Sequence, residues 1–393
     1  MSIFTKFIGS VIEILYIPLL FIICWISRFF NKKYQIGLGP EPLINNIYHK
    51  KALEKYGYSA ETFVNDVFYI TKDFDQIISI KNRYLKRILQ HILHIDFLFF
   101  IFRYEAIYLY FNGGPLQSSK ILSFLEPYLL KTAHIKVVVM PYGGDVQDLS
   151  RSNNLLYKDA MTLDYPEHKL RRKRISMNID RWTTHSDHII SGCDWVDYMH
   201  HWDTLMSAHF SIDIDSIRNK YLKERERNKT FKILHAPNHR DIKGTNYLIG
   251  AVNRLKDEGY DIELRLLERK SNDEVLKEIN NADLIVDQLI IGWYAMFAIE
   301  SMALEKPVIC YLREDLLDFY SQKNILSRED IPLINATTQN IYFVIKKAYE
   351  SPDMLQKASK KGPDFVNDMH SIKSVGMVFS NINESIGLHP KSF

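Results

Sequence analysis

Between residues 231 and 311, short apolar runs alternate with segments whose apolar residues recur at helical spacing. The runs at 231–235, 262–267, 283–286 and 307–311 have the length of strands, and 244–255, 273–279 and 296–304 have the spacing of helices. Strands that are apolar on both faces and separated by helices form a parallel sheet covered on both sides. This half of the chain is therefore predicted to be α/β, with a doubly wound, Rossmann-like sheet.

The first half shows fewer of these apolar strands and helices. Two continuous apolar runs, 106–111 and 135–140, each end in a glycine-containing turn, and a third strand at 34–37 leads through a glycine turn into a helix near 45–56. Between 213 and 229 the chain becomes polar and strongly charged, which suggests a boundary. We expect an apolar segment at 1–33, Rossmann-like domains at 34–225 and 226–370, and a C-terminal tail at 371–393, and 393 residues suit two domains.

Charge and cysteine content narrow the class of protein. Fifty Lys and Arg against 47 Asp and Glu give a net charge of +3, too small for a general nucleic-acid binder, so no nucleic-acid partner is expected. The three cysteines, Cys24, Cys193 and Cys310, lie far apart, with no spacing typical of a zinc or redox motif. A reducing compartment is the simplest interpretation.

An apolar segment at 7–27 suggests contact with a membrane. Residues 14–27 carry no charge, but a full span of about 20 residues must include Glu13, so a tilted anchor and an in-plane interfacial helix both remain open. A helix packed on the globular part is the third alternative. Arg28, Lys32 and Lys33 follow the segment, which would place the body of the protein on the cytoplasmic face of the membrane.

Three further patterns have ordinary explanations beside functional ones. The basic run at 169–174 is typical of a solvated surface, although it could also contact anionic lipid. The histidines near 185–201 fit no standard zinc spacing, and Asp213 with Asp215 imitates an Asp-x-Asp metal motif inside a linker. No metal site and no cofactor are predicted.

The candidate chemistry lies where the strands of the second half end, because ligands of open α/β sheets bind at the carboxyl ends of the strands. After the strand at 231–235 come Asn238, Arg240, Lys243 and Gly244, two cations beside the start of a helix, which suit a phosphate. Glu300 lies on an otherwise apolar helix face, where a carboxylate needs a partner or a ligand. A ribose diol would satisfy it, and so would a neighbouring Lys or Arg.

The residues Arg240 and Lys243-Gly244-Thr245, followed by the run Glu300 to Val308 (ESMALEKPV), resemble the nucleotide-sugar domain of family 4 glycosyltransferases of GT-B fold. The resemblance covers about 231–311 and implies that Arg240 and Lys243 hold the donor diphosphate, while Glu300 holds the ribose. Gly292, Trp293 and Tyr294 would then line the donor side. The family usually has a second Glu eight residues before the first, and Gly292 stands there.

The first half resembles the acceptor domain of the same family in outline. Gly37-Leu38-Gly39-Pro40 resembles its first glycine loop, and the turn Tyr142-Gly143-Gly144-Asp145 resembles its His-Gly-x-Asp turn, with Tyr142 in place of His. The resemblance places Gly39, Tyr142, Gly143 and Gly144 at the substrate. It gives Asp145 a catalytic position, where it would orient a hydroxyl group, although an Asp that caps a glycine turn is equally consistent with the pattern.

The sequence therefore predicts two Rossmann-like doubly wound domains of GT-B type with an N-terminal membrane-associated helix. The predicted activity is transfer of a sugar from a nucleotide-diphosphate-sugar donor to a glycan or lipid-linked acceptor. The resemblance implies that transfer retains the anomeric configuration and needs no metal. Two alternatives remain open, a nucleotide-sugar epimerase of the same fold and a non-catalytic scaffold that binds a nucleotide sugar.

Overall fold

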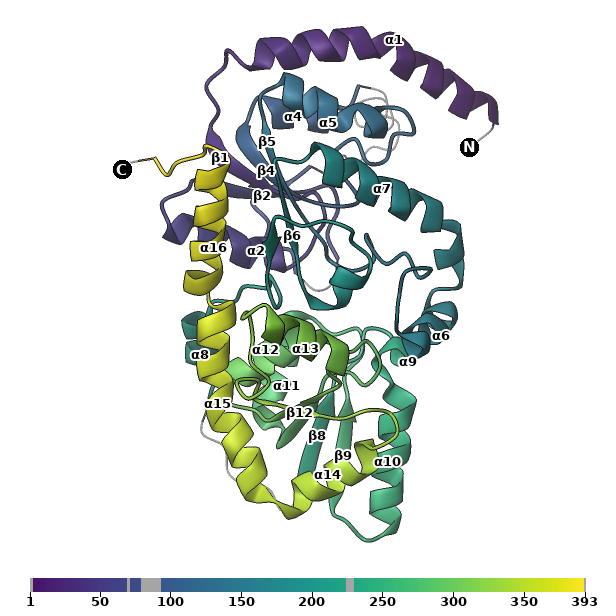
Figure 1. Ribbon diagram of the computed structural model, residues 1–393, viewed down its shortest axis with the longest axis vertical. Coiled ribbons are helices and arrows are strands. Elements are labelled where there is room, and N and C mark those ends of the chain that lie inside the picture. The colour runs from purple at the N-terminus through teal and green to yellow at the C-terminus, as the bar shows by residue number, and fades with distance from the viewer. Residues whose placement is uncertain (1–2, 69–70, 79–92, 224–229, 392–393) are drawn as a thin grey trace.

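The computed structural model describes residues 3–68, 71–78, 93–223 and 230–391, with side chains from residue 11 onward. Two parallel sheets, one in each half of the chain, are stacked along the long axis of the molecule, and helices cover their faces (Figure 1). The predicted α/β architecture of two doubly wound domains is confirmed.

The first sheet has the strand order β3-β2-β1-β4-β5-β6-β7 within the described residues, and every pairing in it is parallel. Its strands are β1 (Tyr34–Leu38), β2 (Ala60–Val64), β3 (Gln76–Ile77), β4 (Tyr104–Tyr110), β5 (Lys136–Met140), β6 (His188–Ser191) and β7 (Thr204–Leu205). The helices around it are α2 (Asn45–Lys55), α4 (Ile95–Ile101), α5 (Leu122–Thr132), α6 (Leu155–Asp164), η1 (Pro166–Leu170), α7 (Arg172–His185), η2 (Cys193–Asp197) and α8 (Ile214–Tyr221). The predicted strands β1, β4 and β5 are present, and β4 and β5 form the centre of the core.

The second sheet, in the order β12-β11-β10-β8-β9, is also parallel throughout. Its strands are β8 (Phe231–His235), β9 (Ile262–Leu266), β10 (Leu284–Val286), β11 (Val308–Cys310) and β12 (Leu333–Asn335). Its helices are α9 (Arg240–Lys243), α10 (Thr245–Asp257), α11 (Asn272–Asn281), α12 (Met296–Ala303), α13 (Glu314–Gln322), α14 (Ile341–Glu350) and α15 (Pro352–His370). The alternation predicted between 231 and 311 is confirmed element by element, with bounds that differ by one or two residues.

The last helix, α16 (Ile372–Ser385), returns to the first half and packs against α2 (Figure 1). Val375 and Phe379 on its inner face are fully buried. At Gly376 an added Cβ would lie 2.5 Å from the carbonyl oxygen of Ala52, so the two helices approach closely because a side chain is missing there. The segment 371–393, expected as a C-terminal tail, thus contains a packed helix.

The N-terminal helix α1 (Ile3–Ser27) lies along the outside of the first half, beside α5 (Figure 1). Leu20 and Cys24 on its inner face are fully buried. Glu13 points into the protein, where its carboxylate accepts a hydrogen bond of 2.9 Å from the Ser119 hydroxyl and lies 3.6 Å from the His94 ring. In the described part of the chain, α1 included, no helix has the length and apolar character needed to cross a bilayer.

Candidate functional site

The loops at the carboxyl ends of the two sheets contact each other. Asn154, after β5, donates a hydrogen bond of 2.7 Å to the carbonyl oxygen of Ile290, in the loop after β10. The backbone N–H of Ile242, after β8, donates to the Asp164 carboxylate at 2.8 Å. The strand-end residues that the sequence singled out in each half therefore border the same interface, as expected for open α/β sheets.

Arg240 and Lys243 lie together in α9 but bind different carboxylates. Arg240 is half exposed and forms two hydrogen bonds of 2.8 Å with Glu268, just after β9, and this pairing raises the pKa of Arg240. The Lys243 ammonium is mostly buried and lies 2.9 Å from the carboxylate of Asp287, just after β10, which is itself buried. The two cations thus flank the carboxyl end of β8, one on each side.

The turns around these cations depend on local backbone features. Asn238 is exposed in the loop before α9. Gly244 separates α9 from α10 with φ +72, a left-handed conformation that favours glycine, and an added Cβ would come within 3.0 Å of Leu289. This glycine therefore lets the loop after β10 pack directly against the loop after β8.

Glu300 lies inside α12 and is 3% exposed. Its carboxylate accepts a hydrogen bond of 2.8 Å from the side-chain amide of Asn272, at the start of α11. Burial raises the pKa of Glu300 to about 7, and the hydrogen bond from Asn272 lowers it only in part. The expected partner of this acid was a Lys, an Arg or a ligand, and the structure places an amide there instead.

Arg313 fills the space beside Gly292. Gly292 has φ +95, and an added Cβ would lie 2.4 Å from Cγ and 2.5 Å from Cδ of Arg313. The Arg313 guanidinium in turn pairs with Asp197 of the first half at 2.6 Å, and both side chains are 6% exposed. A glutamate at position 292, where the family pattern has one, would displace this buried ion pair.

Trp293 and Tyr294 are almost fully buried between the two halves. The Trp293 indole donates a hydrogen bond of 2.8 Å to the carbonyl oxygen of Ser207, and the Tyr294 hydroxyl lies 3.3 Å from the Ser207 hydroxyl and 3.1 Å from the His370 ring. In this conformation both predicted donor-side residues hold the halves together.

Asp145 organises the turn after β5. Its buried carboxylate accepts hydrogen bonds from the backbone N–H groups of Phe111, Tyr142 and Gly143, at 2.9, 3.0 and 3.0 Å. Burial raises the pKa of Asp145 to about 7, against the effect of these amides. The geometry is that of a turn-capping aspartate, while Gly143 (φ +119) and the half-buried Gly144 form the bend itself.

Polar side chains from three strand ends meet beside this turn. Asn112, after β4, donates hydrogen bonds to the Tyr142 hydroxyl at 2.8 Å and to the Glu41 carboxylate at 3.0 Å. Gly39 makes the close turn before Glu41 possible, since an added Cβ would lie 2.0 Å from the carbonyl oxygen of Phe63. Glu41 and Asn112 were not predicted as site residues, although each follows a predicted strand within a few residues.

The basic segment 169–174 borders the same turn. Arg171 donates a hydrogen bond of 3.5 Å to the carbonyl oxygen of Gly144, and Arg172 donates one of 3.1 Å to the Ser150 hydroxyl. Tyr165, just before the segment, contacts the ring of His239 in the second half. The basic run therefore lies on the first-half side of the interface, next to the candidate acceptor turn.

Several residues of the histidine segment and the Asp-x-Asp pattern have other partners. His188 contacts the Thr204 hydroxyl at 2.8 Å, and Asp213 caps α8 and binds Lys51 at 2.7 Å. Asp203 accepts a hydrogen bond of 2.8 Å from the backbone N–H of Ile189. Across the described ranges no three His, Cys, Asp or Glu side chains are grouped so that they could hold a metal ion.

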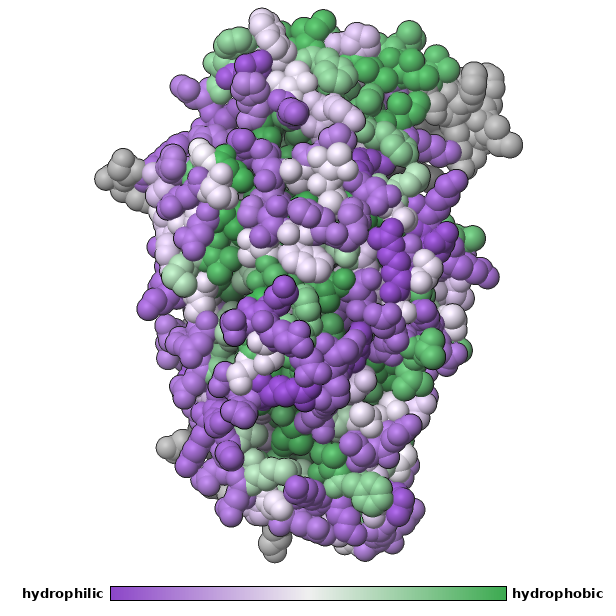
Figure 2. Space-filling view, viewed as in Figure 1, coloured by the Kyte–Doolittle hydropathy of each residue, from purple (hydrophilic) through white to green (hydrophobic). Residues whose placement is uncertain are grey.

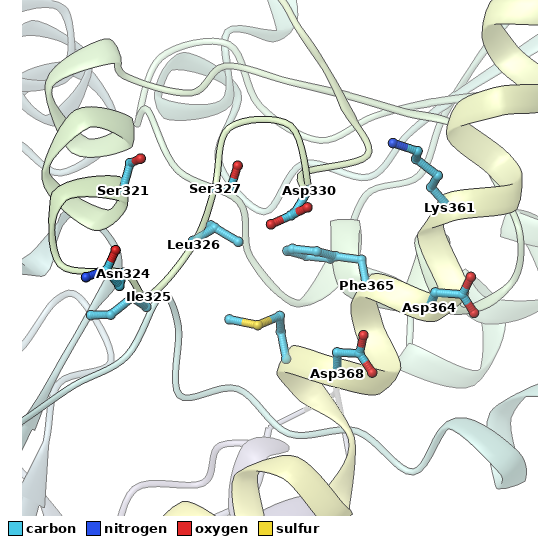
Figure 3. A pocket seen from close by; sticks show the side chains of 11 residues that line it. Ser321, Asn324, Ile325, Leu326, Ser327, Asp330, Lys361, Asp364, Phe365 and Asp368 are labelled. Atoms are coloured by element: carbon cyan, nitrogen blue, oxygen red, sulfur yellow. The ribbon is translucent and has the colours of Figure 1, made fainter.

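A pocket of about 550 Å³ lies away from these residues, between the loop after α13 and α15 (Figure 3). Asp330, Asp364 and Asp368 line it with a single cation, Lys361. Three carboxylates would repel the phosphates of a nucleotide sugar. The pocket is therefore a poor site for such a ligand.

No protein-family model matches the sequence, and no curated protein matches it either. Solved structures do match. Sucrose-phosphate synthase from Thermosynechococcus elongatus superposes with a TM-score of 0.59 at 12% identity, covering 90% of this chain and 99% of that one. Anabaena HepE in complex with UDP and glucose gives 0.57 at 10% identity, covering 90% of this chain and 100% of that one.

A third match is an α-glucosyltransferase in complex with UDP-glucose and DNA, with a TM-score of 0.58 at 12% identity, covering 89% of this chain and 100% of that one. The three matches extend over both halves of the chain and their connection. Identities this low establish the fold alone. With two parallel sheets whose carboxyl ends meet, the chain has the GT-B fold of glycosyltransferases.

Proposed function

We propose that the protein is a glycosyltransferase that moves a sugar from a nucleotide-diphosphate-sugar donor to an acceptor bound at the first half. The observation that carries the proposal is the placement of Arg240, Lys243 and Glu300 around the carboxyl ends of β8 and β10, in a fold whose solved relatives were crystallised with UDP or UDP-glucose.

The donor would bind by replacing contacts that the protein now makes with itself. Arg240 is half exposed and paired with an exposed carboxylate, so it can turn toward a diphosphate at little cost. Lys243 lies beside it, and preorganised cations of this kind stabilise the charge that develops on a departing diphosphate. Glu300 would accept hydrogen bonds from the ribose hydroxyls, and binding a diol there favours its ionised form.

The acceptor is proposed to carry negative charge. The segment 169–174 contributes five cations beside the turn that holds Gly143 and Gly144, and Arg171 contacts that turn directly. Phosphate groups bind arginine well because the guanidinium donates two parallel hydrogen bonds. A lipid-linked glycan, which joins a glycan to lipid through phosphate, meets this requirement, and α1 would keep the enzyme on the cytoplasmic face where such an acceptor is presented.

A non-catalytic scaffold that binds a nucleotide sugar is the second candidate. It is favoured by Arg313, which occupies the space beside Gly292, and by Trp293 and Tyr294, which are buried against the first half. Turnover distinguishes the candidates. Nucleotide released with a glycosylated acceptor supports transfer, an altered sugar without acceptor supports an epimerase, and binding without turnover supports the scaffold.

Donor binding is tested by screening nucleotide sugars for thermal stabilisation and titrating the best one by calorimetry. A donor at a hundred times its dissociation constant should raise stability by about 2.7 kcal/mol. Arg240→Gln should weaken binding at least tenfold, because it removes one charge-assisted contact to phosphate worth about 1.5 to 3 kcal/mol.

The matched control is Arg265→Gln, which breaks a similar pair between the exposed Arg265 of β9 and Glu278 of α11. Equal donor affinity in Arg240→Gln and Arg265→Gln would remove Arg240 from the site. For Lys243 the double change Lys243→Met with Asp287→Asn avoids leaving a buried carboxylate unpaired. Normal donor binding in that variant would reject the phosphate role of Lys243.

We further propose transfer without a bound metal and with retention of the anomeric configuration. The first part is supported by Asp213, which caps α8 and binds Lys51, while Arg240 and Lys243 supply the positive charge. Retention follows only from the family resemblance. Product formation in excess chelator, with the anomeric coupling of the product read by NMR, tests both. Activity lost in chelator and restored by manganese, or an inverted product, would reject the corresponding part.

A further inference from the structure

The face of α1 that points away from the protein is an exposed apolar surface. Leu15 is 75% exposed and Phe29 is 70% exposed. The large apolar residues that share this exposed side are Val11, Ile14, Leu15, Leu19, Ile22, Trp25, Ile26 and Phe29. The hydropathy surface is correspondingly apolar over α1 (Figure 2). A patch of this kind on one helix marks an interaction site.

No charged side chain interrupts this apolar face from residue 11 to residue 27. Glu13, the one charged residue in that stretch, is turned inward onto Ser119 and His94. Positions 15, 19, 22 and 26 recur at intervals of three and four, so they form one continuous stripe on α1, and Phe29 follows in the turn after the helix. The helix is thus apolar outward while its inner face is fixed to the first half, which is the geometry of a helix lying in a membrane interface.

A cationic pocket opens along one flank of this stripe, between α1 and α5. It has a volume of about 690 Å³ and is lined by Phe21, Arg28, Leu125, Tyr128, Lys131, Thr132 and His134. A second pocket of about 250 Å³ shares Arg28 and His134 with it and adds Lys32 and Glu105, whose carboxylate pairs with Lys391 at 2.7 Å. The two pockets therefore adjoin each other at the C-terminal end of α1.

Two cations of this pocket, Arg28 and Lys131, are exposed and form no side-chain hydrogen bond or ion pair with any described residue. Lys32 differs, because its ammonium donates to the carbonyl oxygens of Ser27 and Ile101. Two unpaired cations in a concave site next to an apolar stripe match the two parts of an anionic lipid. The phosphate would meet the cations, and the acyl chains would meet the stripe.

We propose that the pocket between α1 and α5 binds the phosphate of an anionic phospholipid, with Arg28 and Lys131 as its ligands, while the outer face of α1 lies among the acyl chains. This inference rests on the membrane association proposed above and adds its headgroup site. A second copy of the chain is a poorer occupant, because the outer face of α1 carries no acidic side chain between residues 11 and 27 that could pair with Arg28 and Lys131 of the partner copy.

The test is flotation of the full chain with vesicles of phosphatidylcholine alone and with vesicles in which one third of the lipid is phosphatidylglycerol. The double variant Arg28→Gln with Lys131→Gln should bind the anionic vesicles about 30-fold more weakly, which corresponds to about 1 kcal/mol for each cation near the surface. Its binding to phosphatidylcholine vesicles should be unchanged.

The matched control is Lys347→Gln with Lys357→Gln. It removes the same charge from α14 and α15, at the opposite end of the molecule from α1 (Figure 1). This control should bind anionic vesicles as the unchanged protein does. An equal loss of binding to anionic vesicles in both double variants would mean that binding depends on net charge alone, and would reject the pocket as a lipid site. If only the double change Lys169→Gln with Lys173→Gln weakened this binding, the lipid site would be assigned to the basic segment 169–174.

The apolar part is tested separately by Ile22→Asp, which should abolish binding to both kinds of vesicle while leaving the circular dichroism spectrum unchanged.

Failure of the unchanged protein to float with any vesicle would overturn both the membrane association and the headgroup site. Self-association of vesicle-free protein that Ile22→Asp abolishes would assign the stripe to a second copy. Saturation of the pocket by free inorganic phosphate, with no dependence on vesicles, would also reject the lipid. Donor binding is measured without vesicles, so the proposed transferase function stands or fails independently.

Discussion

Gly292 allows a quantitative test of how the two halves are held together. Replacing Gly292 by Ala places a methyl group where Cγ and Cδ of Arg313 now lie, at 2.4 and 2.5 Å, and holds a non-glycine residue at φ +95. The backbone conformation alone costs about 1 to 2 kcal/mol. Displacing Arg313 also weakens its buried pair with Asp197, and the loss of such a pair costs about 3 to 5 kcal/mol.

We therefore expect Gly292→Ala to lower the free energy of unfolding by about 3 to 6 kcal/mol, measured by urea denaturation. Gly250→Ala is the matched control. Gly250 lies in the interior of α10 with nothing within 4 Å of an added Cβ, so that change should stabilise the protein by about 0.5 to 1 kcal/mol.

A double-mutant cycle isolates the steric part of the effect. In an Arg313→Ala background, Gly292→Ala should cost only the backbone contribution, because the side chain that it strikes is gone. The reasoning would be refuted by a cost below about 0.5 kcal/mol for Gly292→Ala, or by an equal cost in the two backgrounds. The same geometry predicts that Gly292→Glu, which restores the residue usual in the family, destabilises the protein and gains no activity.

Three further outcomes are expected. Burial raises the pKa of Glu300 to about 7, so its stabilising contribution is full below the unfolded value of about 4.5 and is lost as the pH rises through 7. Glu300→Gln should therefore reduce by about 3 kcal/mol the fall in unfolding free energy between pH 5 and 8, in urea titrations at both pH values. Asp145→Ala should cost at least about 3 kcal/mol in the same assay because three backbone amides lose their acceptor, and a cost below about 1 kcal/mol would contradict the capping role. Cys24, Cys193 and Cys310 are buried, and burial raises the pKa of Cys24 to about 12, so a thiol reagent should modify them only after unfolding.

The second sheet could be predicted from sequence because its signal is local. Apolar strands and helices at 231–311 alternate within windows of about ten residues, and the periodicity fixes both the type and the order of the elements. In the first half the strands β2, β3, β6 and β7 were missed. β3, β6 and β7 are two, four and two residues long, too short to show a pattern. β2 has five residues, but Glu61 and Thr62 interrupt its apolar run.

The location of the candidate site at the strand ends could be predicted from the sequence, but the contacts within the site could not. Arg240 and Lys243 follow the predicted strand at 231–235, and Glu300 lies in the helix predicted at 296–304, so their common edge could be inferred. Their partners could not be inferred, because Glu268, Asp287 and Asn272 reach them from other turns of the sheet. The burial of Trp293 and Tyr294 also depends on contacts with distant Ser207 and His370, which no local pattern encodes.

The orientation of α1 was left open for a similar reason. The composition of residues 7–27 is compatible with a span, an interfacial helix or a packed helix. The contact that turns Glu13 away from the outer face joins it to Ser119, which lies 106 positions further along the chain. The Glu13 carboxylate, which makes the segment a poor membrane span, thus helps to fix α1 to the first half.

The return of α16 to α2 has a consequence for biosynthesis. The face of the first half that α16 covers stays bare while the ribosome makes the whole second half, which takes roughly 8 to 30 s at 5 to 20 residues per second. The hydroxyl of Tyr108, in the central strand β4, donates a hydrogen bond to the side chain of Asn383 in α16. The middle of the first sheet therefore lacks this contact until α16 has been synthesised. The nascent first half therefore exposes an apolar face, and a chaperone bound to that face should dissociate only after residues 372–385 have left the exit tunnel.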